Sequence, residues 1–86
     1  MKILYFAWFR SRIGVGEEIM TPPADVATVG QLVEWLKGQS PGHAAAFTDN
    51  ALVRAAVNQD FAGFEHSVGP NDEVAFFPPV TGGGGP

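Results

Sequence analysis

The chain has 86 residues, of which 45% are hydrophobic, and it carries a formal net charge of −4 and no cysteine. This length fits one domain with a small core, and the hydrophobic content is that of a globular protein. With only five Lys and Arg in total, nucleic-acid binding is not expected. The lack of Cys excludes disulfides, thiolate metal sites and cysteine nucleophiles.

Residues 3–9 are predicted to form the first strand. Both of its alternating faces are apolar, which predicts a central strand covered on much of both sides. The apolar run is too short to span a membrane and has no signal-peptide cleavage site, so we expect a cytoplasmic protein with no membrane partner. After a glycine turn, residues 17–20 are expected to return as a short antiparallel strand that Pro22 and Pro23 end.

Residues 28–37 carry the signals of the main helix. Thr28 and Gln31 have the spacing of a capping box, and Gly38 is a natural stop. One apolar stripe follows the i, i+3, i+4, i+7 pattern and consists of Val29, Leu32, Val33 and Leu36. A loop is expected over residues 40–42, followed by at most a short helical turn over 44–47.

Three more strands are predicted over residues 52–57, 61–64 and 73–77, and turn sequences lie at 58–60 and 69–72. In the last strand, alternation places Val74 and Phe76 on one face and Phe77 on the other. Pro78 and Pro79 end this strand, because proline cannot donate to the ladder. We expect a domain over residues 1–81 and a flexible glycine-rich tail over 82–86.

The predicted order of elements, β-β-α-β-β-β, indicates an α+β fold: a mixed sheet with one main helix packed on one face. The first and last strands are the most apolar and are expected to be central neighbours. A right-handed crossover through the helix would place the third strand parallel to the first. The β-grasp fold of ubiquitin is one such arrangement, although the pattern alone does not select it over other small α+β folds.

The C-terminal third carries a specific sequence pattern. Residues 57–60, 64–66 and 72–83 read VNQD, FEH and DEVAFFPPVTGG, and residues 4–7 near the start read LYFA, followed by Arg10. This pattern resembles the molybdopterin synthase small subunits, within the wider family of ubiquitin-like sulfur carriers, over about residues 2–83. The resemblance implies the β-grasp fold.

The resemblance also implies that the chain is a sulfur carrier subunit of molybdopterin synthase, not a catalyst by itself. In the family, an E1-like adenylyltransferase uses ATP to adenylate the terminal glycine, and a sulfur donor converts it to a thiocarboxylate. The large subunit of molybdopterin synthase then receives the tail, and the sulfur enters the pterin precursor of the molybdenum cofactor. The implied assembly is a heterotetramer, and the carrier holds no permanent cofactor, since ATP belongs to the activating enzyme.

The resemblance assigns the reaction to the main-chain carboxyl of Gly83, by register from the preceding prolines. Glycines lack Cβ, so the tail can thread a narrow channel. Alternation predicts an exposed aromatic patch beside the tail, and the resemblance matches this patch to the contact surface for the large subunit. The predicted partner-binding residues are Phe6, Arg10, Phe61, Phe77, Pro78, Pro79, Val80, Thr81 and Gly82.

Carriers of the family end at Gly-Gly, whereas this chain continues with Gly84, Gly85 and Pro86. The extra residues are removed by a peptidase, or are an artefact, or mark an inactive chain.

Two other functions compete: a carrier for thiamine or tRNA thiolation, and a β-grasp interaction module without transfer chemistry. His43 and His66 lack metal-ligand spacing and are expected to be structural or solvated, and no convergent side-chain set indicates an independent enzyme.

Overall fold

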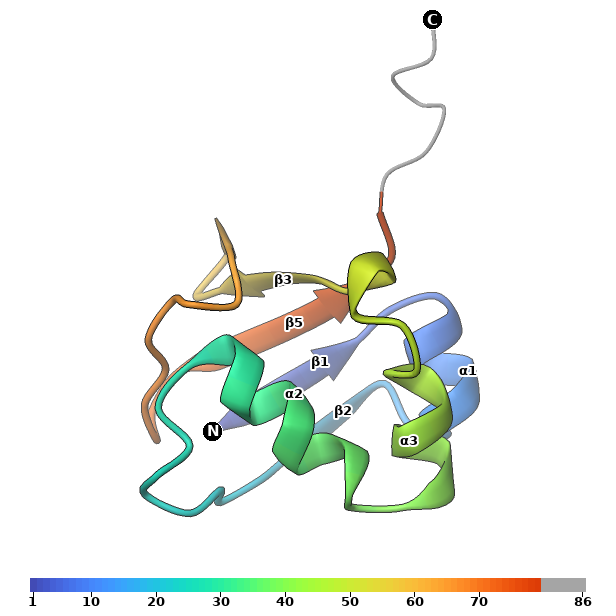
Figure 1. The fold of residues 1–86 in the computed structure, drawn as a ribbon, viewed down its shortest axis with the longest axis horizontal. Helices are drawn as coiled ribbons and strands as arrows, with labels where there is room; N and C mark the ends of the chain where they lie inside the picture. Colours follow the sequence, from blue (N-terminus) through green and yellow to red (C-terminus); the bar gives the residue numbers. More distant parts are fainter. Residues whose placement is uncertain (80–86) are drawn as a thin grey trace, which may run out of the picture.

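The computed structural model describes residues 1–79, which form a five-stranded mixed sheet and three helices (Figure 1). The strands are β1 (Lys2–Tyr5), β2 (Glu17–Ile19), β3 (Arg54–Val57), β4 (Asp60–Ala62) and β5 (Glu73–Phe77). The helices are α1 (Trp8–Ile13), α2 (Val29–Lys37) and α3 (Pro41–Ala46), and a 3-10 turn covers Asn50–Leu52. Within residues 1–79, no helix is long and apolar enough to cross a membrane.

The strand order in the sheet is β2-β1-β5-β3-β4, with β5 at the centre. β1 runs parallel to β5, whereas the other neighbouring pairs are antiparallel. The first and last strands are therefore central neighbours, as predicted. The prediction that the third strand runs parallel to the first is wrong. The helical crossover leaves from β2, which opposes β1, so the strand that follows the crossover takes the direction of β2.

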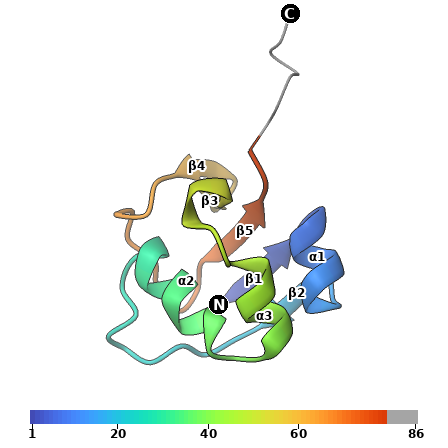
Figure 2. The same cartoon turned by 45° about the vertical axis from the view of Figure 1, so that its right-hand side comes forward.

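Helix α2 begins at the predicted capping box. The Thr28 Oγ1 accepts a hydrogen bond from the Gln31 backbone N–H at 3.2 Å, and the Gln31 Oε1 accepts one from the Thr28 N–H at 3.1 Å. The predicted apolar stripe of α2 is buried in one cluster with the inward residues of β1 and β5. α2 and α3 lie on the same face of the sheet (Figures 1 and 2), and burial of this apolar surface is the main source of stability.

The first strand is shorter than predicted. Ala7 adopts a φ of 52° and turns the chain from β1 into α1. Phe9, which lies within the predicted first strand, is instead part of α1 and is buried, and its ring centroid lies 5.2 Å from that of Phe47. A short apolar run fits a strand and a buried helix equally well. Two later strands also differ from their predicted bounds. β3 begins at Arg54 rather than at residue 52, and β4 spans Asp60–Ala62 rather than residues 61–64.

Helix α3 is longer than the short turn expected at 44–47. Ser40 caps it, because its Oγ accepts a hydrogen bond from the His43 backbone N–H at 3.1 Å, and Pro41 occupies the first helical position. α3 approaches α1 closely at Gly42, where a Cβ would lie 2.5 Å from the Arg12 carbonyl oxygen. The residues expected to form a loop therefore make a helix-to-helix contact.

A polar network ties β1, β2 and α3 together. The Glu18 Oε2 accepts a hydrogen bond from the Tyr5 hydroxyl at 2.7 Å and pairs with the His43 Nε2 at 2.8 Å. The Ser40 Oγ lies 2.7 Å from the His43 Nδ1. His43 is only 6% exposed, and every polar atom of its ring has a partner. It is therefore a structural histidine, as the sequence indicated.

This network predicts a pH dependence of stability. Burial raises the pKa of Glu18, but hydrogen bonds from His43 and Tyr5 outweigh it and hold the pKa below its ordinary value. A carboxyl group with a lowered pKa stabilises the folded state above its unfolded pKa, and this contribution is lost as the pH falls through the folded value. Between about pH 7 and about pH 3, the free energy of unfolding should fall more steeply for the wild type than for Glu18→Gln in urea titrations. Parallel profiles would contradict this role.

The contact between α1 and α3 makes Gly42→Ala disruptive. A Cβ at this position meets backbone rather than a flexible side chain, so we expect a loss of about 1–3 kcal/mol in the free energy of unfolding, measured by urea denaturation. Gly38→Ala is the matched control, because its Cβ would lie 3.5 Å from the Trp35 carbonyl oxygen, and its change should stay below about 1 kcal/mol. Equal stability of the two variants would rule out the close approach.

Candidate functional site

The face of the sheet opposite α2 and α3 is covered by no helix of residues 1–79. Along β1, β3 and β5, residues that point toward the helices are buried, and their neighbours are exposed or half-buried. The expectation that the first strand is covered on both sides is therefore wrong. We call this surface the open face; its residues are Lys2, Leu4, Glu17, Ile19, Arg54, Ala56, Phe61, Glu73, Ala75 and Phe77.

Two aromatic rings meet on the open face. The ring centroids of Phe61 and Phe77 lie 5.8 Å apart, with an angle of 53° between the planes. β3 runs between their strands, and its small Ala56 lies opposite Phe61 in the register, which leaves room for the rings to approach. Phe61 is 85% exposed and Phe77 is half-buried. The prediction that Phe77 points away from the helices is confirmed.

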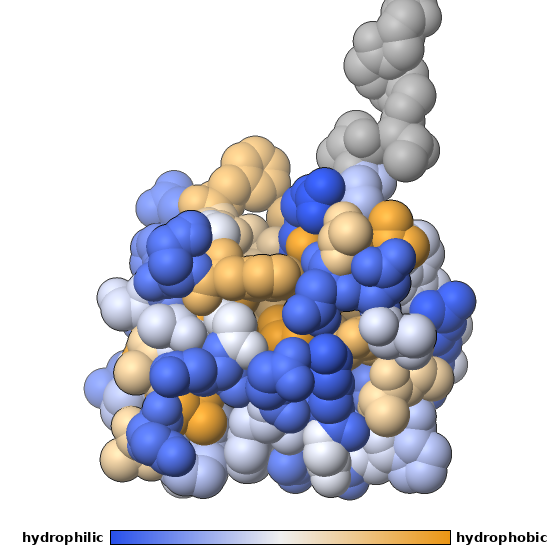
Figure 3. Space-filling view, in the orientation of Figure 1, coloured by the Kyte–Doolittle hydropathy of each residue, from blue (hydrophilic) through white to orange (hydrophobic). Residues whose placement is uncertain are grey.

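A shallow pocket of about 410 Å³ lies beside this pair. Its lining includes Phe61, Phe77, Gly63 and Arg54, which lies opposite Phe77 in the register. Sequence reasoning missed Arg54. A signal for it was present: Arg54 lies between Val53 and Ala55, which are buried. Side chains alternate along a strand, so the Arg54 side chain points to the opposite face. Figure 3 shows apolar residues along the edge of the molecule formed by the β3–β4 region, above a largely hydrophilic helical face.

Phe6 and Arg10 extend this surface toward β2. Phe6 is 51% exposed, and its N–H donates to the Phe76 carbonyl oxygen at 3.1 Å, so the parallel register continues and places Phe6 beside Phe77. Arg10 is exposed on α1, and its guanidinium covers Gly16, where a Cβ would lie 3.4 Å from the Arg10 Cζ. The predicted residues are thus not one cluster but a band across the end of the sheet where β1 and β5 terminate.

Pro78 and Pro79 are half-buried and continue the chain from β5 at this same end. The other predicted site residues, Val80, Thr81, Gly82 and Gly83, lie outside the described residues, and so does the predicted boundary between residues 1–81 and the tail 82–86. Those assignments remain predictions.

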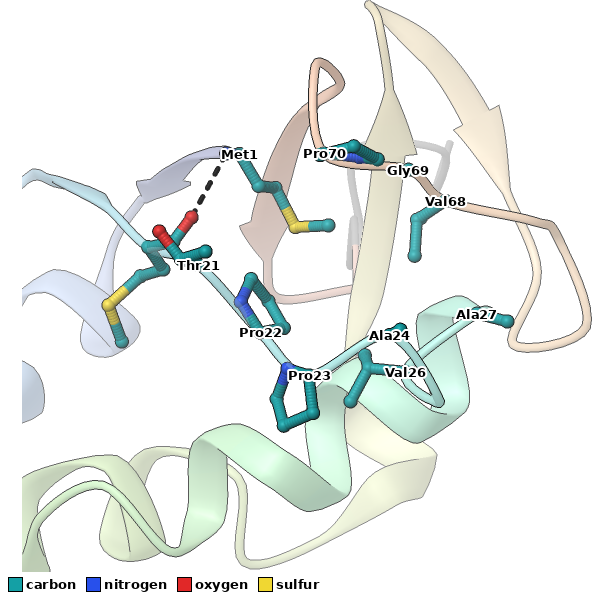
Figure 4. A pocket seen from close by; sticks show the side chains of 11 residues that line it. Met1, Thr21, Pro22, Pro23, Ala24, Val26, Ala27, Val68, Gly69 and Pro70 are labelled. Atoms are coloured by element: carbon teal, nitrogen blue, oxygen red, sulfur yellow. Dashed lines mark hydrogen bonds between the residues drawn. The ribbon is translucent and has the colours of Figure 1, made fainter.

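A second pocket, of about 440 Å³, lies at the opposite end of the sheet (Figure 4). Its apolar wall includes Met1, Met20, Pro22, Val26 and Val68. No predicted site residue lines it. Within residues 1–79 there is also no group of three or more His, Asp or Glu arranged to hold a metal ion.

Fold and site together define a β-grasp protein whose central strand ends beside an exposed aromatic band. The ThiS family model matches residues 3–83. The chain therefore belongs to the ThiS family, which confirms the resemblance to sulfur carriers that the sequence motifs indicated.

Three relatives support this assignment. The chain is 43% identical over 83 residues to the molybdopterin synthase sulfur carrier subunit of Escherichia coli strain K12, covering 96% of this chain and 99% of that protein. The structure of a putative molybdopterin converting factor, subunit 1, from Pyrococcus furiosus aligns with a TM-score of 0.73 at 33% identity, covering 92% and 95% of the two chains. Small archaeal modifier protein 1 of H. volcanii aligns with a TM-score of 0.76 at 27% identity, covering 93% and 97%. These likenesses confirm the predicted β-grasp fold.

Proposed function

We propose that this protein is the sulfur carrier subunit of a molybdopterin synthase and delivers sulfur as a thiocarboxylate on Gly83. The observation that carries the proposal is the 43% identity to the E. coli carrier along 96% of this chain. The reacting group is a main-chain carboxyl, which needs no catalytic side chain. A carrier without cysteine, and without a convergent catalytic set, is suited to this chemistry.

Activation requires a better leaving group on the carboxyl carbon. In the proposed sequence, an E1-like adenylyltransferase brings the Gly83 carboxylate to the α-phosphorus of ATP, and pyrophosphate leaves. A sulfur nucleophile from a donor then displaces AMP and leaves the thiocarboxylate. The carrier itself needs no bound cofactor, because ATP is consumed on the activating enzyme. We place this chemistry in the cytoplasm, where ATP is available.

The proposed partner for sulfur delivery is the large subunit of molybdopterin synthase, in a heterotetramer. The exposed rings of Phe61 and Phe6 at the end of β5 support docking there, since exposed aromatic residues are enriched at interfaces. Residues 80–83 can span at most roughly 13 Å. Such a reach lets the terminal carboxyl enter an active site of the partner while the domain stays outside.

Residues 84–86 follow Gly83 in the sequence, and they prevent activation of its carboxyl group as long as they remain attached. Gly83 has a free carboxyl only when no peptide bond joins it to Gly84. We therefore propose that a peptidase hydrolyses the bond between Gly83 and Gly84 before activation.

Intact-mass analysis tests the proposed reactive end. The 86-residue chain and a chain ending at Gly83 are each incubated with the activating enzyme, ATP and a sulfur donor. Only the shorter chain should gain the mass of one sulfur-for-oxygen exchange, because only it presents the Gly83 carboxyl. The shorter chain without ATP is the control. Sulfur incorporation into the intact 86-residue chain would contradict the proposal.

Substitution of Phe61 tests the docking surface. Phe61→Ser should weaken binding to the large subunit by about tenfold or more, because an exposed aromatic ring is a typical interface anchor. Its free energy of unfolding should change by less than about 1 kcal/mol, because the side chain is 85% exposed. Ile19→Ser is the matched control: Ile19 is 73% exposed on the same open face, but on edge strand β2 at the far end. Calorimetry that finds equal affinities for both variants would place the docking surface elsewhere.

A second candidate function follows from the likeness to small archaeal modifier protein 1. In that case an amine of another protein, rather than sulfur, would take the activated C-terminus. Covalent conjugates in place of a thiocarboxylate would favour this function. Binding to a large subunit separates the proposal from a carrier for thiamine or tRNA thiolation, and tail modification separates it from an interaction module without transfer chemistry.

A further inference from the structure

We propose that Arg54 binds a carboxylate of the docking partner, beside the pocket that takes an apolar side chain of the same partner. The open face would then recognise an acidic residue next to an apolar one. This inference rests on the proposed function, since the partner is the large subunit.

Arg54 is a charged residue that borders the apolar surface formed by Phe61 and Phe77. It lies opposite Phe77 in the register of β3 and β5, and it lines the same pocket as Phe61 and Phe77. Three residues of the pocket lining, Arg54, Phe61 and Phe77, belong to the open face. A partner side chain that enters the pocket therefore comes close to the guanidinium group.

The guanidinium is already held in position. Its Nη1 donates to the Ala51 carbonyl oxygen at 3.0 Å and to the Val53 carbonyl oxygen at 3.1 Å. Nη2 and Nε make no hydrogen bond within residues 1–79, and no carboxylate of these residues forms a salt bridge with Arg54. A fixed guanidinium loses little side-chain entropy on binding, and its free donors match the geometry of a carboxylate.

The distribution of charge on the open face singles out this arginine. At the far end of the sheet, the Lys2 Nζ lies 4.0 Å from the Glu17 Oε2, and Glu73 lies opposite Lys2. At the end where β5 terminates, Arg54 lies in one row with the rings of Phe77 and Phe6. The Glu65 carboxylate lies over Gly63 of the same pocket, but it forms no salt bridge with Arg54. Docking through these rings would remove water from Arg54. A buried cation without a counter-charge costs several kcal/mol, so a partner that covers this row must supply an acceptor, and a carboxylate also matches the charge.

Binding to the large subunit tests this inference, with calorimetry at low and high salt. Arg54→Gln should weaken binding by about tenfold, and Arg54→Glu by about 30-fold or more, because reversal adds repulsion. Arg54→Gln should also show a smaller loss of affinity with salt than the wild type. Arg54→Lys keeps the charge and should bind more tightly than Arg54→Gln. Urea unfolding of each variant checks that loss of the two bonds to backbone carbonyls has not unfolded the domain.

Arg12→Glu is the matched control for net charge. Arg12 is exposed on α1, but it lies over the Trp8 ring at 5.5 Å and donates to the Ala45 carbonyl oxygen at 3.4 Å. It therefore faces α3 rather than the open face. Its charge reversal should change affinity by less than about threefold.

Two results would overturn the inference: affinity of Arg54→Glu within about threefold of the wild type, or an equal loss in Arg12→Glu. If the wild-type chain ending at Gly83 binds and becomes thiocarboxylated in the same preparation, such a result leaves the proposed function intact. If the wild-type chain ending at Gly83 does not bind the large subunit at all, the proposed function and the inference both fail.

Discussion

The parallel pairing of β1 with β5 organises the whole molecule. Residues opposite each other in this pair point to the same side, so Tyr5 and Phe76 enter the core together, and Phe6 and Phe77 lie outside together. Because the two strands run in the same direction, both terminate at the same end of the sheet. Helix α1 and the Pro78–Pro79 segment therefore both follow the sheet at this end (Figure 1). Val74 and Phe76 of β5 are fully buried, so they fix the position from which the C-terminal segment continues.

Local sequence signals predicted correctly those elements for which they are sufficient by themselves. The capping box and apolar stripe of α2 and the alternation of β5 match the structure. Tertiary contacts decide that Phe9 belongs to a helix, because an apolar run alone fits a strand equally well. Ser40 followed by Pro41 is a local helix-start signal, which the predicted loop over residues 40–42 does not include. The predicted direction of β3 is wrong because the helical crossover starts from β2, which is antiparallel to β1. Arg54 could not be recognised as part of a site before the register placed it beside Phe77.

The structure divides the proposed work between two parts of the chain. The domain supplies a rigid body, in which the network of Tyr5, Glu18 and His43 joins β1, β2 and α3. It also supplies an open face whose aromatic rings and Arg54 can recognise a partner. The proposed chemistry belongs to the backbone carboxyl of Gly83 and needs no side chain of the domain. In the proposed function, such a division lets one short chain bind an activating enzyme and then a large subunit.

We propose that partner recognition takes place where β1 and β5 terminate, next to the segment that carries the proposed reactive carboxyl. The most direct measurement is an NMR titration of the isotope-labelled chain with the large subunit, read at each backbone amide. We expect the largest shifts and line broadening at Arg54, Phe61 and Phe77, with little change around Met20 and Val68 in the far pocket. Strong perturbation of the far pocket, with the β3–β5 end unchanged, would contradict it.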